Sequence, residues 1–413
     1  MPRDFYHGAA KGALTADMEQ AMNRFKVLTF NKLAEEGLRR LSAERYEVGP
    51  DVSEPNAIML RSHSLHGLAL PDSLFAVARA GAGVNNIPVD SLSRRGIPVF
   101  NAPGANANAV KELVVGSLLM VARNLPAARD YVRGLSGDDA RIDSAVEAGK
   151  KQFTGFELPS RTLGVIGLGA IGVEVANAGL ALGMQVVGYD PKVTVRRAWQ
   201  LSSGVQQANQ LDEIFERADV ISPHVPLNGE TRALVNRARL ERLPPGAIVL
   251  NFSRRGVVDD AAVLELVRAG RVGAYVTDFP TAALMGQPGI VCLPHLGAST
   301  TEAEANCAVM VAENLKLYLE HGEIRASVNF PDALLPRRRP HRLAIANANV
   351  PAMVGQISIA LAEANINIAD LLNVSRGELA YTLIDVDEPV SRATMERIAA
   401  IDGILCARLL VED

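Results

Sequence analysis

A glycine-rich segment at residues 164–172 constrains the fold of this chain more than any other feature. It reads GVIGLGAIG and sets Gly167, Gly169 and Gly172 in a G-x-G-x-x-G pattern. A strand-like apolar run precedes the pattern, a helical pattern follows it, and the next strand-like run ends at Asp190, 18 residues after Gly172. A strand, a glycine turn, a helix and a later acid are the context that a dinucleotide-binding fingerprint requires. The segment therefore predicts a Rossmann-like domain.

Each glycine of this pattern has a physical role. Gly167 permits the tight turn, Gly169 lets a pyrophosphate approach the backbone, and Gly172 lets the helix pack on the strand. The helix N-terminus adds N–H donors and a positive dipole end. A purely structural glycine turn is the alternative, and the fit of the strand, the helix and the acid argues against it. Asp190 is expected to bind the ribose hydroxyls and repel a 2′-phosphate, which favours NAD over NADP as the cofactor.

The composition excludes several classes of protein. A chain of 413 residues has room for about two to four domains, and 48% hydrophobic with 21% charged residues is ordinary for a globular protein. A net charge of −4 provides no general basic surface, so we expect no nucleic-acid partner. The three cysteines show no metal-ligand spacing, so we expect no metal. An apolar run of about 18 residues and a signal segment are both missing, which predicts a cytoplasmic protein without a membrane partner.

The rest of the chain alternates strand-like and helical patterns, which is typical of parallel α/β sheets. Strands are predicted at residues 25–30 and 56–62, with an amphipathic helix over 33–44 between them. Residues 133–160 read as a polar connection, and a helix is predicted over 301–321. The C-terminal segments take a βαββαβ order, typical of a ferredoxin-like module. The predicted fold class is α/β, with two Rossmann-like parallel-sheet lobes followed by this module.

Several further segments, in a consistent order, resemble motifs of the D-2-hydroxyacid dehydrogenase family, and within it of the phosphoglycerate dehydrogenases. They are ARAGAGVNNI (78–87), NAPGANANAVKELVVG (101–116), DVISPHVPLNGETR (219–232), LNFSRRGVVD (250–259) and PHLGAST (294–300). The resemblance covers about residues 26–413 and implies an NAD-dependent enzyme of two lobes. The domains that it implies, after an N-terminal extension at 1–25, are a substrate-binding domain at 26–107 plus 305–333, an NAD-binding domain at 108–304, a linker at 334–340 and an ACT domain at 341–413.

The oxidation of a 2-hydroxy acid needs a cation for the carboxylate and the C2 oxygen, a base for the hydroxyl proton, and a nicotinamide for the hydride. The resemblance implies that Arg254 is the cation and His295 the base. A guanidinium suits a planar carboxylate because it donates two parallel hydrogen bonds. An imidazole titrates near neutrality, so it can accept a proton and return it.

The resemblance also implies the remaining site residues. Those matched to substrate binding are Arg61, Ser62, Arg79, Gly81 and Asn106, with Arg61 at the position that binds a substrate phosphate. Those matched to NAD binding are Gly167, Gly169, Ala170, Ile171, Gly172, Asp190, His224, Val225, Pro226, Phe252 and Asp278.

One position departs from the family's pattern. A Glu pairs with the catalytic His in the family, whereas Ala282 stands where that Glu is expected, and no carboxylate lies between Asp278 and Glu302. A paired carboxylate orients an imidazole and makes it more basic. The departure leaves three interpretations open, namely a less active enzyme, a substitute acid from a distant segment, or a chain altered at this position.

The C-terminal module resembles an ACT domain, in which amide side chains bind an amino-acid effector. The matching positions hold Asn347, Asn349 and Asn367, and Ala352 replaces a glycine. The resemblance therefore implies L-serine as an effector, with a purely oligomerising module as an equal alternative. In either case we expect a homo-oligomer, a dimer or a tetramer.

The resemblance implies the NAD-dependent oxidation of 3-phospho-D-glycerate to 3-phosphohydroxypyruvate, which opens serine biosynthesis. The partner is then a small phosphorylated hydroxy acid. One alternative is a dehydrogenase for another D-2-hydroxy acid, such as glycerate or 2-hydroxyglutarate. A second, of a different class, is a non-enzymatic protein that senses NAD.

Overall fold

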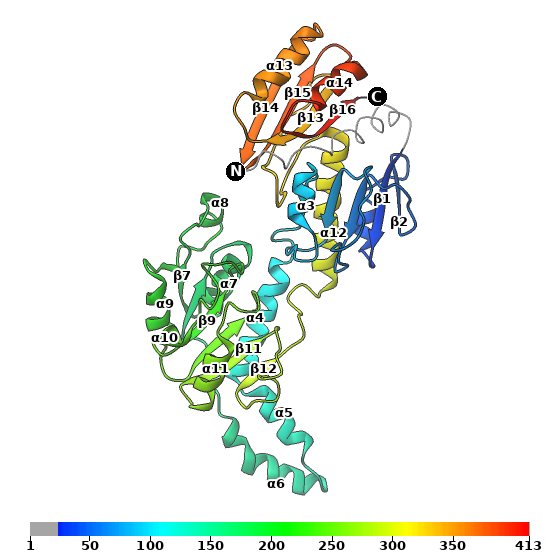
Figure 1. Ribbon diagram of the computed structural model, residues 1–413. Coiled ribbons are helices and arrows are strands. Elements are labelled where there is room, and N and C mark those ends of the chain that lie inside the picture. The colour runs from blue at the N-terminus through cyan, green and yellow to red at the C-terminus, as the bar shows by residue number, and fades with distance from the viewer. Residues whose placement is uncertain (1–23, 413) are drawn as a thin grey trace. The chain divides into compact units, whose positions relative to one another are not determined.

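The computed structural model describes residues 24–412, and these form two compact units (Figure 1). One unit comprises residues 106–300, and the other joins the residues up to 105 with those from 301 onward. Nearly all of the predicted N-terminal extension lies outside the described residues. A search of the described helices finds none with the length and apolar character needed to cross a membrane.

The unit at residues 106–300 is built on a parallel sheet of seven strands in the order β12-β11-β10-β9-β6-β7-β8. The strands are β6 (Thr162–Ile166), β7 (Gln185–Tyr189), β8 (Gln206–Gln207), β9 (Val220–Pro223), β10 (Ala247–Asn251), β11 (Val272–Thr277) and β12 (Ile290–Cys292). The central strands are almost wholly buried, as expected for a parallel sheet covered on both faces. The strand order reverses direction between β6 and β9, which is where such sheets bind ligands.

The helices of this unit include a pair that the sequence did not predict. The unpredicted pair is α5 (Leu125–Arg133) and α6 (Asp139–Gly149). The other helices of this unit are α4 (Ala107–Ala122), the 3-10 helix η3 (Lys150–Phe153), α7 (Ala170–Ala181), α8 (Val195–Ala198), α9 (Leu211–Arg217), α10 (Arg237–Leu240) and α11 (Asp260–Arg268). The segment predicted as a polar connection, 133–160, contains α6 and η3, which the sequence did not predict and neither of which has a buried residue. Neither α5 nor α6 contains a buried residue, so both lie at the surface of this unit.

The other unit contains a second parallel sheet, of five strands in the order β2-β1-β3-β4-β5. Its elements are β1 (Phe25–Phe30), α2 (Glu35–Leu38), β2 (Tyr46–Gly49), β3 (Ala57–Leu60), β4 (Ala76–Arg79), α3 (Val89–Arg94), β5 (Val99–Phe100) and α12 (Thr301–His321). The helix predicted over 33–44 is correct only over α2, because the chain then turns to bury Leu41 and to form β2. The prediction for α12 is confirmed over its full length.

The C-terminal module has the predicted βαββαβ order. Its elements are β13 (His341–Ala348), α13 (Met353–Glu363), β14 (Ile368–Arg376), β15 (Leu379–Val386), α14 (Arg392–Ala399) and β16 (Ile404–Val411). The antiparallel sheet has the order β14-β15-β13-β16, with α13 and α14 beside it in Figure 1. With the two parallel sheets, this module confirms the predicted fold class.

One face of the C-terminal sheet shares a hydrophobic core with α12 and the five-stranded sheet. The cluster joins Met59 and Phe75 of the parallel sheet, Leu315 of α12, and Leu383 and Leu410 of the C-terminal sheet. The module is therefore part of the same folding unit and completes its core.

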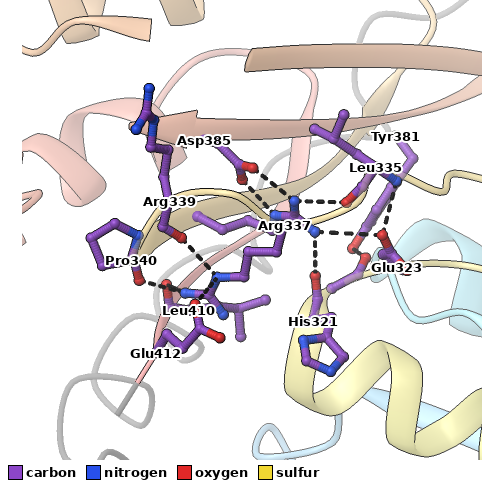
Figure 2. A network of polar contacts seen from close by, with 12 residues as sticks. His321, Glu323, Leu335, Arg337, Arg339, Pro340, Tyr381, Asp385, Leu410 and Glu412 are labelled. Carbon is purple, nitrogen blue, oxygen red and sulfur yellow. Dashed lines mark hydrogen bonds and ion pairs between the residues drawn. The ribbon is translucent and has the colours of Figure 1, made fainter. Parts of the chain in front are cut away.

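A buried ion pair joins the C-terminal sheet to the end of α12. Arg342 of β13 lies opposite Asp385 of β15, and both side chains are 0% exposed. The guanidinium donates to both carboxylate oxygens, from Nε at 2.6 Å and from Nη2 at 2.8 Å. It also donates to the carbonyl oxygens of His321 at 3.1 Å and Leu335 at 2.7 Å, and dashed lines in Figure 2 mark these contacts and those to Asp385. These three partner residues come from three segments, so this one side chain holds α12, the linker and the sheet together.

Candidate active site

The glycine loop follows β6, and its geometry explains each glycine. Gly167 has a φ of +90°, and a Cβ there would lie 2.7 Å from the carbonyl oxygen of His224. A Cβ at Gly172 would lie 1.9 Å from the carbonyl oxygen of Gly167, so only glycine allows this helix–loop contact. A Cβ at Gly169 would meet nothing within 4 Å. The backbone is thus open at the glycine that a pyrophosphate approaches.

The N-terminus of α7 lies directly behind this opening. No side chain caps the helix at Gly169, and the first backbone hydrogen bond within the helix runs from Val173 N–H to the Gly169 carbonyl. The N–H groups of Ala170, Ile171 and Gly172 precede that bond and belong to the turn whose donors have no partner within a helix. Such a turn can receive a phosphate anion.

Asp190 stands at the end of β7 beside the same loop. Its Oδ2 accepts from the Leu168 N–H at 2.8 Å, and its Oδ1 accepts from the Lys192 N–H at 2.8 Å. The carboxylate is therefore fixed in orientation by backbone donors. Each carboxylate oxygen has a further lone pair available to a hydroxyl group.

The segment after β9 brings His224, Val225 and Pro226 next to the glycine loop. Nε2 of His224 lies 3.0 Å from the Ser222 hydroxyl, and its Nδ1 is buried without a hydrogen-bond partner. Burial lowers the pKa of His224 to about 4, so the ring is neutral near pH 7. The Val225 side chain would lie 2.9 Å from a Cβ at Gly167, which shows how closely these two loops pack.

Arg254 lies in the turn that follows β10, two residues after the buried Phe252. The Arg254 side chain is exposed, and its Nη1 donates to the Ser253 carbonyl at 2.6 Å. The neighbouring Arg255 donates from Nη2 to the Pro280 carbonyl at 2.9 Å. Arg254 thus projects from the carboxyl edge of the sheet, the same edge that carries the glycine loop and Asp190.

His295 follows β12 at the same edge and has a carboxylate beside it. Its ring packs against Phe279, with centroids 4.9 Å apart and planes tilted by 52°. Oδ2 of Asp278 accepts from the N–H groups of Leu296 at 3.1 Å and Gly297 at 3.2 Å, so the carboxyl group lies against the loop that carries His295. Burial raises the pKa of Asp278, although the charge of His295 and these N–H groups oppose that shift.

The candidate substrate residues of the other unit gather at the carboxyl ends of β3 and β4. Nε of Arg79 donates to the Arg61 carbonyl at 3.0 Å, and its Nη1 donates to the Gly83 carbonyl. A Cβ at Gly81 would lie 2.7 Å from Nη1 of Arg79, so glycine leaves room for that guanidinium. The Ser62 N–H donates to the side chain of Asn31 at 3.0 Å.

Two of the candidate substrate residues have environments that bear on their role. Nη1 of Arg61 forms an ion pair with Glu304 of α12 at 2.7 Å, and the Arg61 side chain is 35% exposed. Oδ1 of Asn106 is buried without a hydrogen-bond partner at the start of α4.

The three candidate effector residues differ in environment. Asn347 is 1% exposed, and its amide donates to the Ala348 carbonyl at 2.8 Å and accepts from the Thr382 hydroxyl at 3.2 Å. Asn349 is exposed and donates to the Gly377 carbonyl at 3.0 Å, while Asn367 is exposed.

Several residues of these sites were not found from the sequence. Asn31 accepts from two consecutive N–H groups after β3, and Asn86 donates to the carbonyls of Arg61 and His63. Glu304 lies far along the chain from Arg61. Apolar residues that recur every two or 3.6 positions reveal the buried face of a strand or helix. Polar contacts between distant segments produce no such periodicity, so the sequence did not reveal these residues.

Comparisons with known proteins agree with this arrangement. Residues 115–297 match the family described as "D-isomer specific 2-hydroxyacid dehydrogenase, NAD binding domain". The D-3-phosphoglycerate dehydrogenase of Escherichia coli (strain K12) is 31% identical over 353 residues, which cover 82% of this chain and 82% of that relative. The D-3-phosphoglycerate dehydrogenase of Methanocaldococcus jannaschii is 34% identical over 325 residues, which cover 76% of this chain. The chain spans only 58% of the length of that archaeal relative.

Solved structures share the fold. An NAD⁺-bound 3-phosphoglycerate dehydrogenase from Entamoeba histolytica superposes with a TM-score of 0.58 at 23% identity, over 74% of this chain and 99% of that one. The sequence match to the bacterial relative extends over most of both chains, and the matched family model covers the glycine loop, Arg254 and His295. The chain therefore belongs to the D-isomer specific 2-hydroxyacid dehydrogenase family.

Proposed function

We propose that the chain oxidises 3-phospho-D-glycerate to 3-phosphohydroxypyruvate with NAD, the first step of serine biosynthesis. The observation that carries the proposal is the similarity to the E. coli D-3-phosphoglycerate dehydrogenase over 82% of both chains. Arg61 and Arg79 support it, because they place two cations at the carboxyl ends of β3 and β4, where they could bind a substrate phosphate. These cations are additional to Arg254, the candidate for binding the carboxylate.

The NAD site would be formed by the glycine loop, the N-terminus of α7 and Asp190. The opening at Gly169 and the uncapped turn fit a pyrophosphate, and the fixed Asp190 carboxylate fits the adenosine ribose. His224, Val225, Pro226, Phe252 and Asp278 line the neighbouring loops at the carboxyl edge of the sheet. The bound cofactor supplies the acceptor for the C2 hydride.

Arg254 and His295 would carry out the protein's part of the reaction. The Arg254 guanidinium binds the substrate carboxylate and stabilises charge on the C2 oxygen. The neutral His295 imidazole takes the C2 hydroxyl proton during oxidation and returns it during reduction. Asp278 supports this role, because its carboxylate favours the imidazolium that forms.

The test of the substrate is a comparison of keto acids in the reductive direction. NADH consumption is measured with phosphohydroxypyruvate, hydroxypyruvate and 2-oxoglutarate side by side, in the wild type and in Arg61→Gln. We expect the wild type to prefer phosphohydroxypyruvate, and Arg61→Gln to raise its KM while leaving the KM for hydroxypyruvate unchanged. A wild-type preference for an unphosphorylated acid would assign the chain to another D-2-hydroxy acid. Absence of turnover with all three would favour an NAD-sensing protein.

Asp190→Asn is expected to reduce the preference for NAD over NADP by at least about tenfold, which equals about 1.4 kcal/mol. The asparagine keeps one acceptor for the backbone donors and removes the charge that repels a 2′-phosphate. The measurement is kcat/KM for the two cofactors. Glu230→Gln is the control for the loss of one exposed negative charge, because Glu230 is exposed and forms an ion pair with the exposed Lys192. An unchanged ratio in Asp190→Asn would show that the cofactor preference is set elsewhere.

Ala282→Glu is expected to move the acid limb of the pH–rate profile for oxidation to higher pH. A carboxylate near His295 stabilises its imidazolium, and the neutral ring is the form that accepts the proton. Ala282 is exposed and lies three residues after Phe279, which contacts the His295 ring. Ala283→Glu, at the exposed neighbouring position, is the matched control. Superposable profiles for the wild type and Ala282→Glu would rule the hypothesis out.

We further propose that the βαββαβ module is an ACT domain, which binds an effector or mediates assembly into a dimer or tetramer. Asn349 and Asn367 are exposed and accessible to L-serine, whereas Asn347 is occupied within the sheet. Calorimetric titration with L-serine and light scattering distinguish the two roles. Saturable serine binding that is lost in Asn349→Ala would support regulation, and an oligomer without serine binding would support a purely oligomerising module.

A further inference from the structure

A single buried amide, that of Asn251, holds the turn that carries Arg254. Asn251 is the last residue of β10 and is 2% exposed. Its Oδ1 accepts from the Ser253 N–H at 3.2 Å and from the Ser253 hydroxyl at 2.9 Å. Its Nδ2 donates to the Arg254 carbonyl at 3.2 Å and to the Tyr275 hydroxyl at 3.4 Å. An amide offers two donors and two lone pairs, so every hydrogen-bonding group of Asn251 is used in one orientation.

Tyr275 extends this arrangement to the start of α11. It lies on β11, is 1% exposed, and accepts from Asn251 through its hydroxyl oxygen while donating to Oδ1 of Asp260 at 3.4 Å. Burial raises the pKa of Tyr275, so its hydroxyl keeps the proton that it donates. Burial also raises the pKa of Asp260, and the hydrogen bond from Tyr275 and the charge of Arg255 partly offset that rise. The contacts thus run in one donor-to-acceptor direction from Asn251 through Tyr275 to Asp260.

The rest of the turn leaves Arg254 dependent on this amide. Gly256 has a φ of +85°, and its carbonyl accepts from the Ala233 N–H at 2.8 Å, which fixes the far end of the turn. The Arg254 carbonyl accepts from the Val257 N–H at a longer 3.4 Å. The Asn251 contact at 3.2 Å is therefore the shorter of the two on that carbonyl.

We propose that Asn251 and Tyr275 are positioning residues, which fix the backbone of Arg254 and so set the direction from which its guanidinium meets the substrate carboxylate. The inference rests on the proposed function, because it takes Arg254 to be the carboxylate-binding cation. Bidentate recognition depends on angle as well as distance, so a small rotation of this turn costs binding. A displacement of about 1 Å at such a group lowers the rate by about 10²-fold.

Asn251→Asp and Tyr275→Phe test the proposal with little change in shape. The carboxylate of Asn251→Asp turns two donors into acceptors and sets an oxygen against the Arg254 carbonyl. Tyr275→Phe removes one hydroxyl contact and keeps the packing of the ring. Val249→Ala is the matched control, because Val249 is buried on the same strand and has no polar side-chain contact.

The main measurement is the binding of oxamate, a 2-keto-acid mimic, to the NADH-loaded protein, followed by NADH fluorescence. Asn251→Asp is expected to weaken oxamate binding about tenfold or more. Tyr275→Phe is expected to weaken it about two- to fivefold, the loss of one neutral hydrogen bond. NADH affinity stays within about twofold in all variants, and Val249→Ala loses stability with no loss of oxamate affinity. In turnover, the KM for the keto acid rises more than kcat falls.

The outcomes separate this inference from the proposed function. Oxamate affinities in Asn251→Asp and Tyr275→Phe equal to that of Val249→Ala would overturn the positioning role. If Arg254→Gln loses oxamate binding but the wild type turns over no keto acid, the proposed function fails while the positioning role is still decided by the binding data. If Arg254→Gln binds oxamate as the wild type does, Arg254 is not the carboxylate-binding cation and the positioning role falls, whereas turnover of phosphohydroxypyruvate still decides the proposed function.

Discussion

Replacing His295 with asparagine is expected to lower kcat by about 10²–10⁴-fold, the usual contribution of a general acid–base group. Asparagine keeps a polar side chain of similar reach and cannot take up the hydroxyl proton near neutral pH. His295 lies after β12 at the sheet edge that also presents Arg254, and its ring is held against Phe279. The measurement is pre-steady-state NADH formation, which separates the hydride step from product release.

The control for His295→Asn is His66→Asn. His66 is an exposed histidine of the other unit, and its Nε2 lies 3.1 Å from the Asn85 carbonyl. We expect His66→Asn to turn over at the wild-type rate and His295→Asn to bind NADH with unchanged affinity. A His295→Asn protein that retains the full rate at pH 7 would mean that another group takes the proton.

The second large effect is expected on the stability of the C-terminal module, when the buried Arg342–Asp385 ion pair is broken. Asp385→Ala is expected to lower the free energy of unfolding by about 3 kcal/mol, because the fully buried Arg342 loses its bidentate carboxylate and keeps only the longer ion pair with Glu323 at 3.7 Å. The double variant Arg342→Met/Asp385→Leu is expected to recover at least half of that loss, since it removes both charges of the buried pair. Recovery stays incomplete because the carbonyls of His321 and Leu335 lose their donor.

The comparison for this effect is an exposed ion pair in the same module. Arg392 and Glu396 pair at 2.9 Å with side chains 55% and 52% exposed, so Glu396→Ala should cost less than about 1 kcal/mol. Hydrogen exchange of the β13 and β15 amides measures the opening of this unit directly. If Asp385→Ala accelerates exchange no more than Glu396→Ala does, Arg342 is stabilised by its carbonyl partners rather than by the carboxylate.

The sequence predicted the elements with strong periodicity and could not predict those without it. The glycine loop is marked by the spacing of its glycines, and the βαββαβ module and α12 are marked by apolar residues at a regular spacing; all three are found. Helices α5 and α6 bury no residue, and the sequence did not predict them. The region after Leu38 leaves its helix early because tertiary burial of Leu41 overrides helix propensity.

Polar pairs between residues far apart in the chain also could not be predicted from the sequence. Arg342 and Asp385 are 43 positions apart, and the basic linker next to Arg342 gives no sign that this arginine is fully buried. The resemblance predicted that Arg61 binds substrate, whereas nothing in the sequence pattern of α12 predicted that Glu304 pairs with Arg61. The hydrogen bond between Asn251 and Tyr275 likewise joins two neighbouring strands, and the sequence of either strand alone does not predict it.

The discontinuous unit sets an order of events during synthesis on the ribosome. The core around Met59 and Phe75 is completed by Leu383 and Leu410, so residues up to 105 emerge long before their packing partners exist. At about 5–20 residues per second, the roughly 300 intervening residues take about 15–60 s to translate. Residues 106–300 are contiguous and can fold in that interval. The nascent chain must therefore hold an unfinished apolar sheet while its middle portion folds, which makes β1, β3 and β4 the segments most in need of a chaperone.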